Sequence, residues 1–167
     1  MQIRPERPYD IAGIHTLHRH AFGTSTEADL VDLLRHQAQP IVSLVAEVDL
    51  VIVGHILFSP VSIAPHPDVR IMGLAPMAVL PARQRKGIGS KLVRTGLDEC
   101  QWLGASAVVV LGHASYYPRF GFRPASAFGL TCQFNVPDDV FMALELIPGM
   151  LRGKHGTIRY HPAFASV

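Results

Sequence analysis

The sequence is poor in charge and has no massed basic segment, and both shortages exclude classes of protein. Only 17% of its 167 residues are charged whereas 49% are hydrophobic, which excludes a disordered or polyelectrolyte chain. That length and composition predict one domain with a substantial core. The net charge of +2 comes from scattered basic residues, so no nucleic-acid partner is expected.

Long apolar runs and cysteine-rich patterns are also missing. The most apolar run, residues 50–58, is interrupted by Gly54 and His55 and falls far short of the roughly 20 residues that a spanning helix needs, so no membrane partner is expected. The stretch MQIRPERPYD at the start lacks the apolar core of a signal peptide. Cys100 and Cys132 have no metal-like spacing, so reduced thiols and a cytoplasmic location are expected.

Nine histidines raise the question of a metal site. The densest group, HTLHRH, contains His15, His18 and His20. It has no neighbouring carboxylate or cysteine in the sequence that would complete a ligand set. We therefore expect no metal cofactor.

Apolar periodicity divides the chain into strands and helices. Strands are expected at residues 3–5, 41–48, 51–63, 71–79, 107–111, 120–124 and 140–147. Helices are expected at residues 9–22, 23–39 and 88–103, with one or two helical turns at 115–119. Because proline cannot donate to a ladder, the strand at 71–79 should carry a bulge or a splay at Ala75–Pro76. This order predicts a mixed α/β or α+β fold around one central sheet, in a domain of residues 1–147 with residues 148–167 packed on it as an irregular tail.

A basic stretch with two glycines, ARQRKGIGSKLV, joins the strand at 71–79 to the helix at 88–103. The first N–H groups of a helix have no internal partners, and the helix dipole adds positive potential there. Gly87 and Gly89 allow an anion to approach the backbone, and Arg83, Arg85 and Lys86 add charge. The spacing fits neither a Walker loop nor a dinucleotide fingerprint, which disfavours other nucleotide-binding domains. Two interpretations stay open: a phosphate cradle, or only a tight helix entry with a solvated basic turn.

Three motifs carry a resemblance to a known family. QRKGIG, residues 84–89, matches the Gln/Arg-x-x-Gly-x-Gly/Ala signature of the GNAT superfamily of acyl-CoA-dependent N-acetyltransferases. GLAPMAVLP, residues 73–81, resembles the bulged fourth strand of that family, and YYPRFGF, residues 116–122, resembles its aromatic segment after the fifth strand. TEADLVDLLR, LGHASYYPRFGF and RYHPAF are most similar to a bacterial subgroup of predicted N-acetyltransferases. The resemblance implies a GNAT-like mixed sheet of about six or seven strands with a splayed fourth strand, flanked by about four helices.

The resemblance also implies acetyl-CoA as co-substrate. The fourth strand would contact the pantetheine arm, the loop amides would hold the pyrophosphate, and Met77 or Ala78 would direct an N–H toward the thioester oxygen. His113 and Ser115 are included because they follow a central strand at its carboxyl end, where α/β sheets place ligands. The cofactor-binding residues are thus expected to be Met77, Ala78, Val79, Gln84, Arg85, Lys86, Gly87, Ile88, Gly89, Ser90, His113, Ser115 and Tyr116.

The implied reaction is direct attack of a primary amine, on a small molecule or a peptide, on the thioester. Tyr117 takes the position of the family's proton donor to the departing thiolate, with its neighbour Tyr116 as the alternative; both could instead be packing aromatics. The fourth strand has no acid or histidine to serve as a base. The base therefore stays open among Glu27, Glu47, His55 and His113.

Two functions from different classes remain under consideration. Tyr117 and the glycine pair favour an N-acetyltransferase, whereas the missing fourth-strand acid favours a non-catalytic acyl-CoA-binding regulatory module. The sequence does not identify the acceptor. It does not decide oligomeric state either, although a homodimer could form through an exposed final strand or through the apolar tail AFASV.

Overall fold

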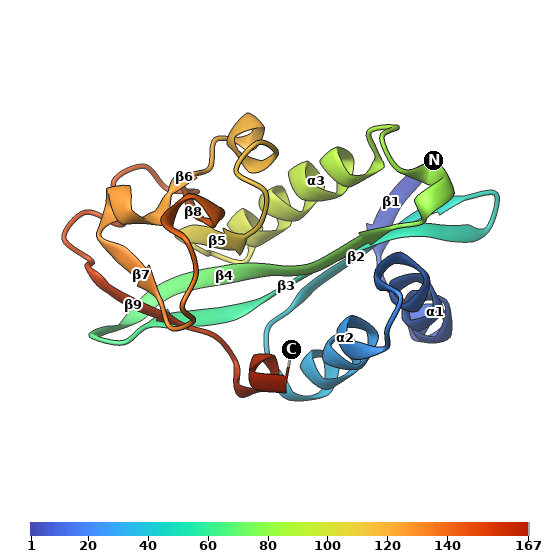
Figure 1. Ribbon diagram of the computed structural model, residues 1–167, viewed down its shortest axis with the longest axis horizontal. Coiled ribbons are helices and arrows are strands. Elements are labelled where there is room, and N and C mark those ends of the chain that lie inside the picture. Colours follow the sequence, from blue (N-terminus) through green and yellow to red (C-terminus); the bar gives the residue numbers. More distant parts are fainter. Residues whose placement is uncertain (167) are drawn as a thin grey trace.

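The computed structural model describes residues 1–166 and places one twisted sheet between two layers of helices (Figure 1). Helices α1 (Ile11–Phe22) and α2 (Thr26–Gln37) cover one face, and α3 (Ile88–Trp102) covers the other. Residues 1–166 thus contain three α-helices where about four helices were expected. The fourth is a short 3-10 helix, η3 (Tyr117–Phe120), which Pro118 opens and Gly121 ends in a left-handed conformation.

The sheet is mixed, which confirms the expected fold class, and it contains nine strands within residues 1–166. Their order is β1-β2-β3-β4-β5-β8-β6, with β9 beside β3 and β7 beside β9. The β4–β5 and β7–β9 pairs are parallel and the others antiparallel. The count exceeds the expected six or seven because β7 and β9 are too short to show a period of two in the sequence. The bounds are β1 (Gln2–Pro5), β2 (Val42–Val48), β3 (Val51–Ile63), β4 (His66–Val79), β5 (Ala107–Leu111), β6 (Arg123–Pro124), β7 (Leu130–Cys132), β8 (Phe141–Glu145) and β9 (Gly156–Arg159).

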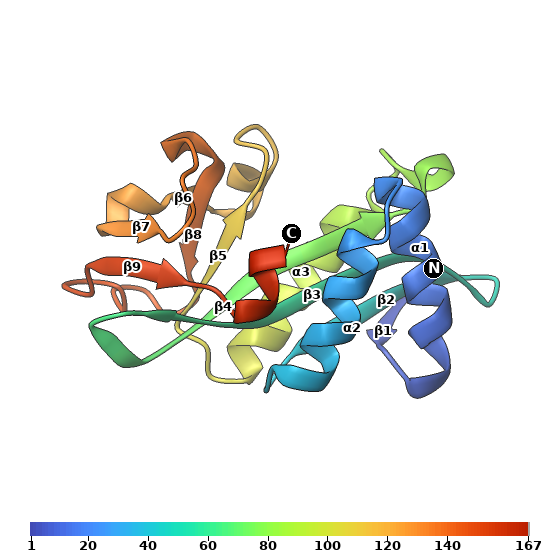
Figure 2. The same cartoon turned by 60° about the horizontal axis from the view of Figure 1, so that its bottom comes forward.

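Strands β4 and β5 part in the middle of the sheet, and Figure 2 shows β5 turning away from β4. Their parallel pairing ends at Leu74 and Val110. At the same point, Ala75 and Pro76 together oppose the single residue Leu57 on β3, where the register shifts. The bulge predicted from Pro76 is therefore confirmed. Beyond it, one edge of β4 pairs with β3 while the other is open.

The sheet separates two hydrophobic cores, and the side chains of β5 alternate between them. Val108 and Val110 belong to the hydrophobic cluster under α3, and Ala107 and Val109 belong to the cluster under α1 and α2. Alternate side chains of a strand point to opposite faces, so this short apolar run is buried on both sides. The sheet is thereby covered on both faces at β5.

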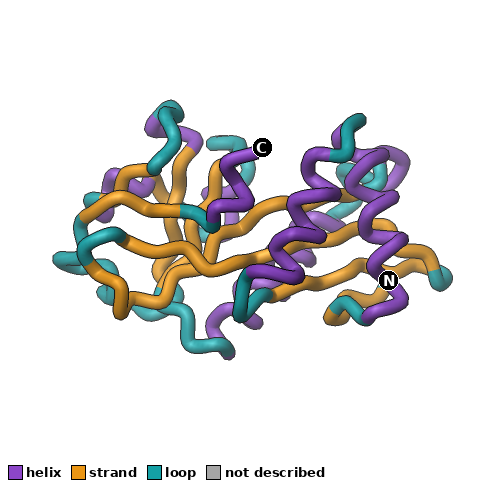
Figure 3. The backbone as a smooth tube through the Cα atoms, turned by 90° about the horizontal axis from the view of Figure 1, so that it is seen from below, coloured by secondary structure: helices purple, strands orange, loops and turns teal. Residues whose placement is uncertain are grey.

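The end of the chain is part of the fold and not an irregular surface tail throughout, which corrects the expectation for residues 148–167. Strand β9 pairs with β3 and β7, and Ile158, Tyr160 and Phe164 are buried in the cluster on the α1–α2 side. The 3-10 helix η6 (Pro162–Ser166) packs against α2, beside which it lies in Figures 1 and 3. These contacts bring residues far apart in the sequence to one side of the sheet.

The final strand and part of the apolar tail, the two surfaces suggested for a dimer, are covered by other residues of the same chain. Strand β8 lies between β5 and β6, so it is not an exposed final strand. Ala163 and Phe164 of the apolar tail are buried, and Val167 lies outside the described residues. A homodimer therefore stays a prediction, and neither of these two surfaces supports it.

Within residues 1–166, no helix combines the length and the apolarity that crossing a bilayer requires.

Candidate active site

A cleft of about 1010 Å³ opens where β4 and β5 part. Ile88 and Tyr117 on its wall belong to the core cluster under α3, whereas Leu30 and Phe164 belong to the cluster on the opposite face. The cleft therefore crosses the sheet. We call the part around residues 83–90, Tyr116 and Arg119 the loop end. The helix end is the part lined by Phe22, Glu27, Leu30, Phe134, Tyr160 and Phe164.

The loop end is built on the N-terminus of α3. Gly87 caps the helix with φ +85°, a left-handed conformation that favours glycine. The first intrahelical hydrogen bond is donated by the N–H of Lys91 to the carbonyl of Gly87 at 3.1 Å, so the N–H groups before it are available to a ligand. The first turn of α3 carries no acidic side chain, and Arg83 and Arg85 line the cleft beside it. This is the arrangement of an anion site.

Side chains from three elements hold the loop end together. The Gln84 amide donates to the carbonyl of Val79 at 3.0 Å, which ties the loop to the end of β4. The hydroxyl groups of Ser90 and Tyr116 are 3.1 Å apart, which ties α3 to the segment before η3. A Cβ on Gly89 would lie 3.2 Å from the Tyr116 oxygen, so glycine is the residue that best fits the close approach between the first turn of α3 and Tyr116.

Arg119 is a cation of the loop end that the sequence analysis missed. Its guanidinium lies over the ring of Tyr116, 4.5 Å from the centroid, and it lines the cleft with Arg83 and Arg85. The sequence feature that could have indicated Arg119 is its position within the YYPRFGF motif, two residues after Tyr117. Three guanidinium groups therefore face any anion bound here.

Tyr117 reaches the cleft from the α3 side of the sheet. The side chain is 7% exposed and lines the cleft, and its ring meets that of Phe122 edge-to-face with centroids 5.7 Å apart. Gly112 makes room for it, because a Cβ there would lie 2.3 Å from the Tyr117 ring. Burial raises the pKa of Tyr117 to about 12, so the phenol is protonated at neutral pH. Both interpretations of this tyrosine fit, since it packs as a core aromatic and also reaches the cleft.

Most of the predicted cofactor residues meet in this cleft. Ala78 does not, because it is buried in the sheet opposite His55 on β3. Lys86 and Ser115 are exposed outside the lining. The predicted residues that line the cleft are Met77, Val79, Gln84, Arg85, Gly87, Ile88, Gly89, Ser90, His113, Tyr116 and Tyr117.

The four candidate bases separate into two groups. Glu27 and His113 line the cleft. Glu47 does not, because it pairs with Arg4 at 3.3 Å, and His55 is fully buried elsewhere in the core. The Oε2 atom of Glu27 is shielded from solvent and has no hydrogen-bond partner within residues 1–166. A carboxylate thus enters the cleft from α2, whereas residues 71–79 of β4 supply none.

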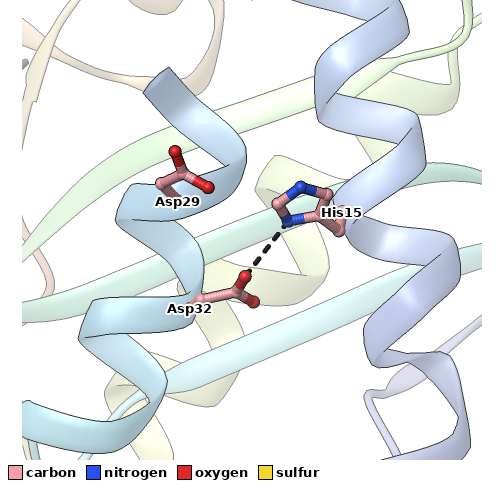
Figure 4. Close-up of side chains that lie close together, drawn as sticks. All are labelled: His15, Asp29 and Asp32. Atoms are coloured by element: carbon pink, nitrogen blue, oxygen red, sulfur yellow. Dashed lines mark hydrogen bonds and ion pairs between the residues drawn. The ribbon is translucent and has the colours of Figure 1, made fainter. Parts of the chain in front are cut away.

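The histidines of the HTLHRH motif do not converge. His18 is fully buried, whereas His15 is partly exposed and its Nδ1 lies 3.1 Å from a carboxylate oxygen of Asp32, with Asp29 close by (Figure 4). The expectation that this motif lacks carboxylates is therefore wrong for His15, because α2 supplies two. Arg35 also binds Asp32, at 2.7 Å, so this group is an ion-pair network that joins α1 to α2.

The aromatic residues of the helix end were also missed. Phe134 and Tyr160 have ring centroids 5.6 Å apart, and Tyr160 and Phe164 have theirs 5.2 Å apart, so the three rings form one wall. All three come after residue 122, and Tyr160 and Phe164 belong to residues 148–167, which were expected to pack as an irregular tail. The RYHPAF motif contains two of them and was the available signal.

Comparisons with known proteins agree with this geometry. The model of the acetyltransferase (GNAT) family matches residues 11–122. YjhQ of Escherichia coli K12, named an uncharacterized N-acetyltransferase, is 42% identical over 134 residues, which cover 78% of this chain and 74% of that protein. YhbS of the same strain, also named an uncharacterized N-acetyltransferase, is 36% identical over 165 residues, or 98% of each chain.

Two solved structures share the fold at similar identity. The crystal structure of YhbS from Escherichia coli in complex with CoA has a TM-score of 0.92 and 35% identity, covering 98% of this chain and 91% of that one. A GNAT family acetyltransferase from Brucella melitensis in complex with acetyl-CoA has a TM-score of 0.81 and 40% identity, covering 98% and 97%. The family match, these relatives and the cleft through the parted sheet agree, and this chain belongs to the GNAT family of acetyltransferases.

Proposed function

We propose that this acetyltransferase moves the acetyl group of acetyl-CoA to a primary amine of a small molecule or peptide by direct attack. The observation that carries the proposal is the single cleft that joins the anion site at α3, the Tyr117 phenol and the opposite face of the sheet. Two substrates can therefore meet within the sheet from opposite sides. CoA and acetyl-CoA in the YhbS and Brucella structures support the same donor here.

The donor binds at the loop end and along β4. The N–H groups at the start of α3, with Arg83 and Arg85, receive the pyrophosphate. The pantetheine arm follows the open edge of β4, where Met77 and Val79 line the cleft and β5 no longer pairs. Backbone groups on an open edge need partners, and the amides of the arm supply them. The Met77 N–H stabilises the thioester oxygen as negative charge develops on it.

The reaction requires one group that donates a proton and another that accepts one. The neutral amine nitrogen attacks the thioester carbonyl carbon, the C–S bond breaks, and the electron pair leaves on sulfur. Tyr117 donates its phenolic proton to the thiolate, and the nitrogen loses a proton to a group in the cleft. Among the candidate bases that line the cleft, Glu27 and His113 are positioned for that step. The products are an N-acetylated amine and CoA.

Calorimetric titration with acetyl-CoA tests the donor site. Gly87→Glu places a carboxylate where the pyrophosphate should bind, so we expect affinity to fall at least about hundredfold. Gly153→Glu is the matched control, because Gly153 also has a positive φ (+74°) and open space around it, but does not line the cleft. Equal acetyl-CoA affinity in the two variants, or no binding by the wild type, would overturn the proposal.

The alternative function, an acyl-CoA-binding regulatory module, predicts acetyl-CoA binding without CoA release for any amine. Measuring the release of the CoA thiol therefore separates it from an enzyme.

The two cysteines, Cys100 and Cys132, are unpaired, which favours the reducing cytoplasm as the location.

A further inference from the structure

The helix end of the cleft combines one carboxylate with an aromatic wall. Among the described residues that line the cleft, Glu27 is the only carboxylate. Leu30 lies one turn further along α2, on the same side of the helix, and packs in one cluster with Tyr160 and Phe164. Helix α2 also packs against η6, which carries Phe164. The carboxylate and the rings therefore face one compartment.

The charges in the cleft are separated. Arg83, Arg85 and Arg119 lie at the loop end, and the helix end has Glu27 with no cationic side chain among its lining residues in the described chain. A second positive charge on an acceptor would meet rings and an aliphatic side chain, which cannot replace its lost hydration. An acidic group on the acceptor would find no cation there and would be repelled by Glu27.

We infer that the acceptor is a hydrophobic monoamine, of the arylalkylamine type, whose ammonium group docks at Glu27 and whose ring packs against Phe134, Tyr160 and Phe164. This inference rests on the proposed acetyl transfer and names its substrate class. Glu27 has an oxygen that is shielded and without a hydrogen-bond partner among the described residues, so the substrate's N–H groups satisfy an acceptor that residues 1–166 leave unpaired. Once docked, the ammonium gives one proton to the Glu27 carboxylate, the neutral amine attacks the thioester, and the second proton that the nitrogen loses as the amide forms passes to His113, the other candidate base that lines the cleft.

The position of the aromatic wall in the sequence explains why membership of the family does not indicate the class of acceptor. The family model ends at residue 122, and Phe134, Tyr160 and Phe164 all follow it. The donor end of the cleft thus lies within the matched segment, and the aromatic wall lies outside it. The aromatic part of acceptor recognition therefore depends on the last third of this chain, whereas Glu27 lies within the matched segment.

The test measures CoA release from acetyl-CoA with 2-phenylethylamine, butylamine, 1,4-diaminobutane and phenylalanine as acceptors. We expect kcat/KM for 2-phenylethylamine to exceed that for butylamine by about tenfold, because the ring gains the aromatic contacts. We expect the diamine and the amino acid to react more slowly than 2-phenylethylamine. A diamine or phenylalanine that reacts faster than 2-phenylethylamine would overturn the inference and leave acetyl transfer standing.

Variants assign the effect to the two parts of the compartment. Glu27→Gln should lower kcat/KM for both monoamines about a hundredfold while acetyl-CoA affinity is unchanged, because only the acceptor loses its counter-charge. Asp29→Asn is the matched control, since it removes an exposed carboxylate from the same first turn of α2 and should change nothing. Phe134→Leu should lower the preference for the aryl amine over butylamine, and its thermal midpoint reports whether the fold is intact.

Each failure has a distinct meaning. Absence of acetyl-CoA binding would refute the proposed function itself. Binding with no acetylation of any of the four amines would overturn the inferred substrate class. Equal activity of Glu27→Gln and the wild type, or an unchanged aryl preference in folded Phe134→Leu, would do the same.

Discussion

Two buried histidines should make the stability of this fold fall steeply just below neutral pH. His18 on α1 and His55 on β3 are fully buried, and His18 Nε2 lies 2.8 Å from His55 Nδ1. Burial, aided by the charge that His55 can carry, lowers the pKa of His18 to about 3 from an ordinary 6.5. Burial also lowers the pKa of His55, although its interaction with Glu6 opposes the shift. The pair is therefore neutral in the folded protein.

The size of the effect follows from proton linkage. An unfolded histidine binds a proton as the pH falls through 6.5, whereas folded His18 stays neutral until about pH 3. The contribution of such a group is complete above pH 6.5 and is lost as the pH falls from 6.5 toward 3. One pH unit below the unfolded pKa the loss is about 1.4 kcal/mol for His18, and His55, whose pKa is also lowered, adds a loss of the same sign.

Urea denaturation followed by circular dichroism at pH 7.5, 6.5 and 5.5 measures this loss. A loss of about 1.4 kcal/mol from His18 should lower the urea midpoint by about 0.7 M, given a slope near 2 kcal/mol per M, and His55 should add to this shift. His18→Leu removes one titrating group and should reduce the pH dependence, whatever it does to stability at pH 7.5. His36→Leu removes a histidine with an exposed side chain and should leave it unchanged. A wild-type midpoint that is equal at pH 7.5 and 5.5, or a His18 resonance that titrates near 6.5, would refute the reasoning.

Three other predictions follow from individual contacts. Tyr117→Phe should lower kcat about a hundredfold with acetyl-CoA affinity kept; because the phenol titrates only at about 12, the wild-type rate should not fall with rising pH below about pH 11. Gly96→Ala would place a Cβ 2.2 Å from the ring of Phe58, so urea denaturation should show a loss of about 1–3 kcal/mol, and an unchanged midpoint would contradict this packing. Arg4→Leu strips the counter-ion from buried Asp10, 2.7 Å away, and should cost about 3–5 kcal/mol; the double variant with Asp10→Leu should recover most of it if the unpaired charge is the cause.

The parts of the fold that the sequence predicted are those with local signals. Helix α3 shows its apolar face within its own residues, and β5 is a short β-branched run that only a doubly covered strand tolerates. Pro76 predicts the bulge because it cannot donate a ladder hydrogen bond. The break between the strands expected at 41–48 and 51–63 was also placed correctly, although it contains no glycine. Asp49 and Leu50 adopt positive φ angles there, of 49° and 66°.

In the last third of the chain, β6 and β8 were expected, but β7, β9 and the packing of the tail could not be placed because they depend on distant partners. Strand β9 is only four residues long and exists because β3 and β7 offer it their edges. Tyr160 is buried because Gly73 on β4 leaves room for its ring, which a Cβ at that position would approach to 3.2 Å. Neither relation has a periodic signature in the sequence. The same is true of His15, whose carboxylate partners come from the next helix.

The two ends of the cleft differ in the same way, which explains why the donor could be expected and the acceptor could not. The loop end binds through backbone N–H groups, so glycines and a helix start within one short motif describe it. The helix end depends on side chains from α1, α2, the segment at Phe134 and the tail, and no single stretch contains them. The buried pair of His18 and His55 joins α1 to the sheet. Acid that protonates this pair therefore loosens the layer that carries the acceptor end, while the anion site on α3 lies on the opposite face.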